Sequence, residues 1–348
     1  MPNPIFKVNR LSFVLLFLSC LNAPAQEVGM VAATRSAFLQ MIDRPRVPLA
    51  AAVKVLPNAD GLTQEQFSYT SEQAQRVPGI LLKKTGLGRR PAVIVLHGTG
   101  GNKEGQLGLL KTLAAQGFVA IAIDGRYHGE RQTGTGATQY VEAMLQTYRT
   151  GKGRPFLYDT VWDVLRLLDY LETRPDVDAA RIGVIGFSKG GMETYLAAAV
   201  DPRIAVAVPL IGVQSFRWAL DNDMWMSRVG TFQAAVDAAA KDAGAGQVDA
   251  AFVRRFYDRV APGIYTQFDG PAMLPLIAPR PLLVINGDSD ARTPLPGLTT
   301  CITAAEQTYK QTGAADRLRL HLQKDTGHAV TPAALTRATD WFVQWLNP

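Results

Sequence analysis

The chain has 348 residues, of which 47% are hydrophobic, so it can bury a full core, and α/β proteins of this size often form one domain. The formal net charge is +6, but the basic residues are scattered and never form a run of five or six. We interpret the positive charge as solvated surface, and it does not indicate a nucleic-acid site.

The first 25 residues have the layout of a secretory signal peptide. Lys7 and Arg10 precede the apolar stretch Leu11–Leu21, and the small residues of Ala23–Ala25 follow as a cleavage site. The apolar stretch is shorter than the roughly 20 residues that a membrane-spanning helix needs. We therefore predict a periplasmic or secreted protein without a stable membrane span. Cys20 leaves a lipoprotein as the alternative, although the residues before it fit a lipobox poorly.

Residues 26–64 form an N-terminal extension with a weak pattern. Met30–Ile42 has the spacing of a short helix, prolines punctuate the residues after it, and no function can be inferred there. The main domain is predicted over residues 65–348. It opens with the alternating strand Gln66–Ser71 and a second strand, Arg76–Lys83, which together indicate the antiparallel start of a mixed sheet.

A βαβ unit comes after these strands. Ala92–Leu96 is a continuous apolar run, as expected for a strand buried on both faces, Lys103–Gln116 is helical, and Phe118–Ile123 repeats the buried-strand pattern. The Gly- and Thr-rich segment Gln132–Pro155 is predicted to be a long loop with one helical turn near Tyr140–Tyr148. Loops of this length inside a domain are often functional or mobile.

Helical and strand patterns alternate through the rest of the chain. Helices are predicted at Asp159–Leu171, Met192–Val200, Leu298–Gln311 and Pro332–Leu346, and strands at Ile182–Ile185, Ile204–Ile211, Pro281–Asn286 and Leu318–Gln323. Residues 214–275 are rich in Ala, Met and aromatic residues, and we predict that they form a helical insertion over the carboxyl edge of the sheet. The fold class is therefore α/β, with a mostly parallel sheet and helices on both faces.

Ser188 is the first candidate catalytic residue. It lies in Gly186–Gly190, a G-x-S-x-G pattern placed where a buried strand breaks abruptly into a helix. The sharp turn projects the serine hydroxyl above the sheet edge, and the flanking glycines relieve crowding. The pentapeptide alone is a weak signal, since a polar turn can produce it, but its strand-turn-helix context favours a nucleophile.

An aspartate and a histidine follow Ser188 in the loops after the next strands. Asp290 and His328 both lie at predicted carboxyl ends, where reactive groups of such sheets gather. A serine hydroxyl needs a base to take its proton, and imidazole suits that task when a carboxylate orients it. Asp288 competes with Asp290, but it directly follows a turn glycine and can cap the loop, so we predict Asp290 as the partner of His328.

An acyl-transfer reaction also needs donors for its oxyanion. The backbone N–H of Lys189, just after the nucleophile, is one candidate, and an N–H of the loop after His97, most simply that of Thr99, is the other.

These segments together resemble the α/β-hydrolase superfamily. The resemblance rests on His97–Gly101, Gly186–Gly191, Gly287–Pro294 and Gly327–His328, and it extends over residues 65–348. The spacing of Gly287, Asp290 and Pro294 matches the acid loop of that superfamily. The doubled glycine after the serine is similar to the branch of acetyl-xylan esterases, dienelactone-hydrolase-like proteins and the catalytic domain of prolyl oligopeptidases.

The resemblance implies a serine carboxylic-ester hydrolase that acts on a small-molecule or saccharide ester. Dienelactone hydrolases use cysteine where this chain has Ser188, and prolyl oligopeptidases carry a large propeller for which there is no sequence here. A serine peptidase or amidase on the same fold is the alternative, and a non-catalytic binding protein is a third, weaker one.

Other chemistry-bearing residues have plainer interpretations. Trp218 and Trp225 in the insertion are predicted substrate contacts, with the insertion's own core as the alternative role. His97, His128 and His321 are expected to be structural. No CxxC occurs and no histidine pair has helical spacing with a carboxylate, so neither a metal site nor a cofactor is predicted.

Overall fold

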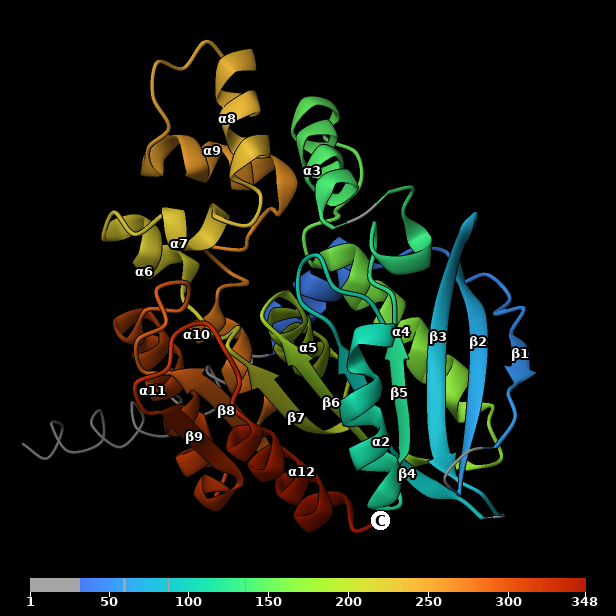
Figure 1. Cartoon of the computed structure of the whole chain (residues 1–348). Coiled ribbons are helices and arrows are strands. Elements are labelled where there is room, and N and C mark those ends of the chain that lie inside the picture. Colours follow the sequence, from blue (N-terminus) through green and yellow to red (C-terminus); the bar gives the residue numbers. More distant parts are fainter. Residues whose placement is uncertain (1–31, 59–60, 87, 135) are drawn as a thin grey trace, which may run out of the picture.

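The computed structural model describes residues 32–58, 61–86, 88–134 and 136–348 (Figure 1). The predicted signal peptide, residues 1–25, lies outside the described residues, as does the start of the predicted helix Met30–Ile42. No helix within the described ranges has both the length and the apolar character needed to cross a bilayer.

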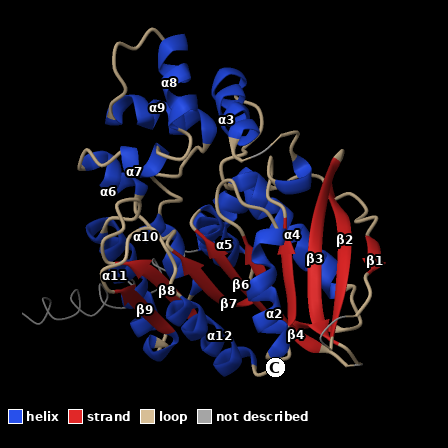
Figure 2. Cartoon of the chain, viewed as in Figure 1, coloured by secondary structure: helices blue, strands red, loops and turns tan. Residues whose placement is uncertain are grey.

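The described strands form one sheet in the order β1-β2-β3-β5-β4-β6-β7-β8-β9 (Figure 2). Their bounds are β1 (Ala52–Val55), β2 (Leu62–Glu72), β3 (Gln75–Lys84), β4 (Arg90–Leu96), β5 (Val119–Ile123), β6 (Val177–Phe187), β7 (Ile204–Leu210), β8 (Leu282–Gly287) and β9 (Leu318–Gln323). The strand pairs β1–β2, β2–β3 and β3–β5 are antiparallel, and all the other described pairs are parallel. The predicted mixed, mostly parallel α/β sheet is confirmed.

Helices cover both faces of this sheet. The long helices are α2 (Leu107–Ala115), α3 (Thr138–Thr150), α4 (Tyr158–Glu172), α5 (Lys189–Val200), α8 (Gln233–Asp242), α9 (Ala250–Val260), α11 (Leu295–Gln311) and α12 (Pro332–Leu346); α6 (Phe216–Asp221), α7 (Met226–Val229) and α10 (Gly270–Met273) are short. Alternate residues of β4 show why the strand is apolar throughout. Val93 and Val95 pack in one core with α2 and α12, while Ile94 and Leu96 pack in the other with α4, α5 and α11.

The described part of the N-terminal extension, residues 32–58 and 61–64, packs onto or pairs with the rest of the domain. A helix over residues 32–42 buries Phe38, whose ring meets those of Tyr158 and Phe268 edge-on, each at a centroid distance of 5.0 Å. The Arg35 side chain donates hydrogen bonds to the carbonyl oxygens of Ala199 and Leu276, at 3.0 and 2.8 Å. The extension therefore contributes to the core, although its sequence pattern is too irregular to show this.

The segment predicted as a long loop, Gln132–Pro155, contains a regular helix instead. Helix α3 runs over Thr138–Thr150 and buries Tyr140, Met144 and Thr147, which recur every three or four residues. This period is that of one helical face. The surrounding Gly- and Thr-rich composition obscured it, and the single predicted turn was too short.

Helix α3 and the insertion together form a cap over the carboxyl end of the sheet (Figure 1). Helices α6 to α9 follow β7, and α3 packs against α8 and α9. The rings of Tyr148 and Phe256 stack at 5.4 Å, and Arg149 Nε lies 2.6 Å from an Asp242 oxygen. We use "cap" below for α3 with α6–α9. The predicted helical insertion over the carboxyl edge is present, and it is joined by a segment from earlier in the chain.

Candidate active site

Ser188 lies on the tight turn between β6 and α5. Its backbone has φ +52° and ψ −109°, a strained combination for a residue with a side chain. A Cβ on Gly186 would collide with the carbonyl oxygen of Gly190, and a Cβ on Gly190 would collide with that of Leu96. The two glycines of the G-x-S-x-G pattern are thus required by close backbone approach, and the turn they allow presents the serine hydroxyl.

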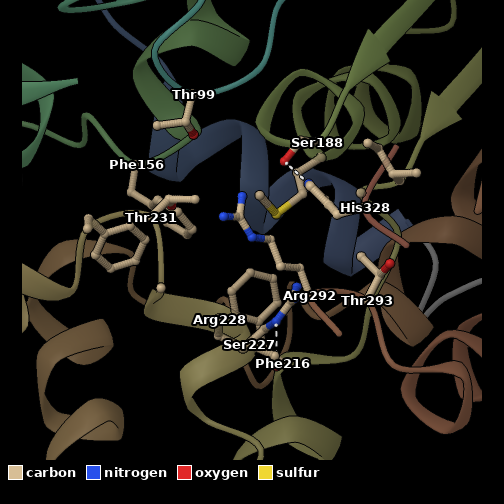
Figure 3. Close-up of a pocket in the computed structure, with 15 residues that line it drawn as sticks. Thr99, Phe156, Ser188, Phe216, Ser227, Arg228, Thr231, Arg292, Thr293 and His328 are labelled. Atoms are coloured by element: carbon tan, nitrogen blue, oxygen red, sulfur yellow. Dashed lines mark hydrogen bonds between the residues drawn. The ribbon is translucent and has the colours of Figure 1, made fainter. Parts of the chain in front are cut away.

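A chain of two hydrogen bonds links Ser188 to His328 and His328 to Asp290. His328 Nε2 lies 2.9 Å from Ser188 Oγ (Figure 3). His328 Nδ1 lies 2.7 Å from Asp290 Oδ2. Since a carboxylate can only accept, Nδ1 carries the proton and Nε2 is free to take one from the serine. Asp290 comes from the loop after β8 and His328 from the loop after β9, so three parallel strands deliver the three groups to one edge.

Asp290 is held as an ionised acceptor. Its Oδ1 accepts the backbone N–H of Arg292 at 2.8 Å and that of Thr293 at 3.3 Å, and its Oδ2 also accepts the Thr293 hydroxyl at 2.6 Å. Burial raises the pKa of Asp290, but the hydrogen bonds from His328 and Thr293 outweigh it, so the pKa lies below the ordinary aspartate value. The carboxylate is therefore available to hold the imidazole.

The competing carboxylate, Asp288, braces the two loops. It accepts the backbone N–H groups of Asp325 and Thr326, at 3.0 and 3.1 Å, and it does not bond to His328. These hydrogen bonds lower the pKa of the Asp288 carboxyl. The structure thus gives Asp288 the loop-capping position and Asp290 the position beside the imidazole, as the sequence predicts.

The loop after β4 lies against Ser188. His97 is buried; its Nδ1 donates to the Gly98 carbonyl at 2.7 Å, and its Nε2 accepts the Gly125 N–H at 2.9 Å. Burial and the nearby Lys189 charge lower the pKa of His97 to about 3, so the ring stays neutral and fixes the loop. A Cβ on Gly98 would lie 3.7 Å from Ser188 Cβ, and Thr99 borders the same pocket as Ser188.

A pocket in front of Ser188 is lined by the cap and by the loops of the sheet edge (Figure 3). Its lining residues are Thr99, Phe156, Ser188, Met192, Ile211, Gly212, Phe216, Ser227, Arg228, Gly230, Thr231, Phe232, Arg292, Thr293 and His328. Three phenylalanines supply an apolar wall, and two arginines supply the charge. Sequence reasoning missed these arginines, because nothing local marks them as facing Ser188.

Trp218 and Trp225, the two tryptophans predicted as substrate contacts, are not among the residues that line this pocket. The Trp218 ring lies against Gly297 at the start of α11, so that a Cβ there would come within 2.9 Å of it. Trp225 is half-buried against the core of the domain. The insertion turns other residues, Phe216 and Arg228 among them, toward the serine.

A buried ion pair supports the turn from behind. Lys189 and Glu193, one helical turn apart in α5, are each 1% exposed, and their charged atoms lie 2.6 Å apart. The i, i+4 spacing was the signal in the sequence that could have revealed this pair. His128, also buried, has its pKa lowered to about 2, chiefly by burial, and its Nδ1 bonds to the Arg126 carbonyl at 2.7 Å. His128 and His321 take no part in the contacts of Ser188.

Comparison with known proteins identifies esterases and other hydrolases as relatives of this chain. The sequence profile described as "Glucuronyl esterase, fungi" matches residues 70–313. YtaP of Bacillus subtilis is 29% identical over 286 residues, which cover 78% of this chain and 84% of YtaP. The 4-O-methyl-glucuronoyl methylesterase of Hypocrea jecorina is 28% identical over 219 residues, covering 59% of this chain and 46% of that protein.

Solved structures share the fold at lower identity. Acetyl xylan esterase 1 from Thermoanaerobacterium matches with a TM-score of 0.67 and 18% identity, over 90% of this chain and 93% of that one. A glucuronoyl esterase from Solibacter usitatus matches with a TM-score of 0.60 and 16% identity, over 89% and 92% of the two chains. The chain has the α/β-hydrolase fold, belongs to the glucuronyl esterase family that the profile describes, and is a carboxylesterase-type hydrolase.

Proposed function

We propose that the protein cleaves carboxylic esters through an acyl-enzyme formed on Ser188, with His328 as general base and Asp290 as the group that orients it. The observation that carries the proposal is the continuous hydrogen-bond chain from Ser188 Oγ through the imidazole to Asp290. The turn at Ser188 is a second support, because its φ of +52° with ψ of −109° is a strained combination, and such residues cluster at active sites.

In the proposed reaction His328 Nε2 takes the proton of Ser188 as Oγ attacks the ester carbonyl. The oxyanion forms between the backbone N–H groups of Lys189 and Thr99. The first is the leading N–H of α5, which an α-helix leaves without an intrahelical partner, and the second bonds to no other described residue. His328 then protonates the leaving alcohol, and the same groups activate water to release the acid.

We propose a sugar ester as the substrate class. Relatives are named as methylesterases of 4-O-methyl-glucuronoyl groups, and structural neighbours as acetyl xylan esterases. The aromatic wall of Phe156, Phe216 and Phe232 can pack against an acyl chain or the apolar face of a sugar ring. Export by the segment over residues 1–25 would bring the enzyme to extracellular saccharides, and mass spectrometry of the protein from periplasm or medium tests whether it starts at Gln26.

The proposed function is tested with Ser188→Ala. The purified variant and wild type are assayed on p-nitrophenyl acetate, methyl glucuronate, acetylated xylo-oligosaccharides and an aminoacyl anilide, and a serine-directed phosphonate is added to both. We expect ester turnover to fall on the order of 10⁶-fold in the variant, and labelling of wild type alone. Labelling at another serine, or faster cleavage of the anilide than of every ester, would refute the proposal.

A further inference from the structure

Arg228 is a buried cation in the wall of the active-site pocket. It lies in α7 of the cap, is 7% exposed, and lines the same pocket as Ser188 and His328 (Figure 3). A guanidinium remains protonated across the physiological pH range, so the protein holds a full positive charge at this place.

Arg228 forms no ion pair with any carboxylate of the described chain. The hydrogen bond that its guanidinium makes within the described residues runs from Nε to the Ser227 hydroxyl, at 3.3 Å, and its Cζ lies 5.3 Å from the centroid of the Phe216 ring. Its two terminal nitrogens bond to no other described residue. These two nitrogens are not fully enclosed, unlike Nε of Arg154 and of Arg166, and the Arg228 side chain lines the pocket.

Asp269 and Asp290, the two carboxylates that act on Arg228 electrostatically, form their hydrogen bonds with other groups. Asp269 accepts the Ser215 hydroxyl at 2.6 Å and the N–H of Phe216 at 2.7 Å, and Asp290 is taken by His328 and Thr293. Burial accordingly lowers the pKa of the Arg228 guanidinium. A buried charge without a counter-ion destabilises a fold, and the π face of Phe216 compensates it less than a carboxylate would.

A second cation borders the same space. Arg292, in the loop that carries Asp290, is exposed and lines the pocket, whereas no aspartate or glutamate belongs to the 15 lining residues. Guanidinium groups bind carboxylates through two parallel hydrogen bonds, and a partly enclosed site strengthens such bonds. We propose that the natural substrate carries a carboxylate-like anionic group in addition to its ester and that Arg228, assisted by Arg292, binds that group; this inference rests on the proposed ester hydrolysis at Ser188.

The test uses two pairs of esters that differ in charge. Mono-p-nitrophenyl glutarate and p-nitrophenyl butyrate place or omit a carboxylate on the acyl side. Acetate esters of 4-hydroxybenzoate and of 4-hydroxybenzamide do the same on the alcohol side. Each enzymatic kcat/KM is divided by the rate of hydroxide hydrolysis of that ester, so that the ratio within a pair reports recognition of the charge. We expect wild type to favour the anionic ester of at least one pair by about 10- to 100-fold, the range for hydrogen bonds to a charged group.

Three variants assign the preference to its residue. Arg228→Met keeps most of the side-chain volume and removes the charge, and we expect it to abolish the preference; Arg228→Lys should retain part of it. Arg255→Gln is the matched control, because Arg255 lies in the same insertion over the Phe252 ring at 5.2 Å but is exposed and outside the pocket lining. This control should leave the preference unchanged. Since the buried charge lacks a counter-ion, Arg228→Met should not lower the melting temperature.

Each outcome decides the inference. It is overturned if wild type hydrolyses neutral and anionic esters equally, a result that leaves the proposed ester hydrolysis standing. It is also overturned if Arg228→Met keeps the preference and loses several degrees of melting temperature, since the arginine is then structural. If no ester of either pair is hydrolysed, the proposed function fails, and anion binding is decided by whether glutarate raises the melting temperature of wild type more than that of Arg228→Met.

Discussion

Replacing Asp290 by Asn should invert the hydrogen-bond polarity of His328. In the wild type, backbone N–H groups of Arg292 and Thr293 point at Oδ1 and cannot reverse, so an amide NH2 would be repelled there. The NH2 must then occupy the Oδ2 position, where it faces His328 Nδ1, while the Thr293 hydroxyl can turn its proton to Asn286 Oδ1 at 2.8 Å. His328 responds by moving its proton from Nδ1 to Nε2, and it can no longer accept the proton of the serine.

The expected loss in kcat is therefore about 10⁴-fold, equivalent to about 5 kcal/mol of transition-state stabilisation. The assay is p-nitrophenyl acetate hydrolysis at pH 7 under saturating substrate, with the melting temperature of each variant recorded beside it. Asp288→Asn is the matched control, because it removes the charge two residues away that binds the N–H groups of Asp325 and Thr326. We expect this control to lower the melting temperature and to retain turnover. The reasoning is refuted if Asp290→Asn stays within about tenfold of wild type, or if Asp288→Asn is the slower enzyme.

Two further predictions concern stability. The pKa of His97 is lowered from 6.5 to about 3 by burial and by Lys189, so its contribution to stability is complete above pH 6.5 and is lost as the pH falls toward 3. Between pH 7 and pH 4, the free energy of unfolding of His97→Gln in urea should therefore decrease by on the order of 3 kcal/mol less than that of wild type. Equal decreases in the two proteins would contradict the assignment. Glu193→Gln should lower the free energy of unfolding by about 3–5 kcal/mol, because it leaves the buried Lys189 charge without a partner. The double variant Lys189→Met with Glu193→Leu should be more stable than Glu193→Gln alone. The reverse order in urea unfolding would show that the pair is not coupled.

Strand positions were predicted well where a strand is buried on both faces. The apolar run Ala92–Leu96 lies within β4, Arg90–Leu96, and the predicted strand Phe118–Ile123 contains β5, Val119–Ile123, which is buried throughout. Such runs are continuous because both neighbouring layers are apolar, and this signal is local. Helix α3 was predicted only as one turn near Tyr140–Tyr148, because no packing partner for its buried face is visible in the sequence around it.

In the candidate site, too, residues with a local sequence signal were predicted, and residues placed by long-range contacts were not. Ser188, Asp290 and His328 could be found from the sequence, because each follows a strand end within a characteristic turn. The placement of Arg228 and of Trp218 depends on how the cap folds onto the sheet, which is set by contacts between residues distant in the chain, such as Tyr148 with Phe256. The sequence therefore indicated the three residues that we propose react, but not the side chains that line the pocket beside them.

The brace at Asp288 has a consequence for how the site tolerates change. By fastening the loop after β8 to the loop after β9, it makes the carboxylate and the imidazole a single preassembled module at one border of the sheet. The serine belongs to a separate module on β6, and β7 is the strand between them. Substitutions that shift β7 should thus alter the distance from Ser188 to His328 while the Asp290 contact stays constant. Core mutations or laboratory evolution would therefore act by changing the position of Ser188 relative to His328, without replacing any of the three residues.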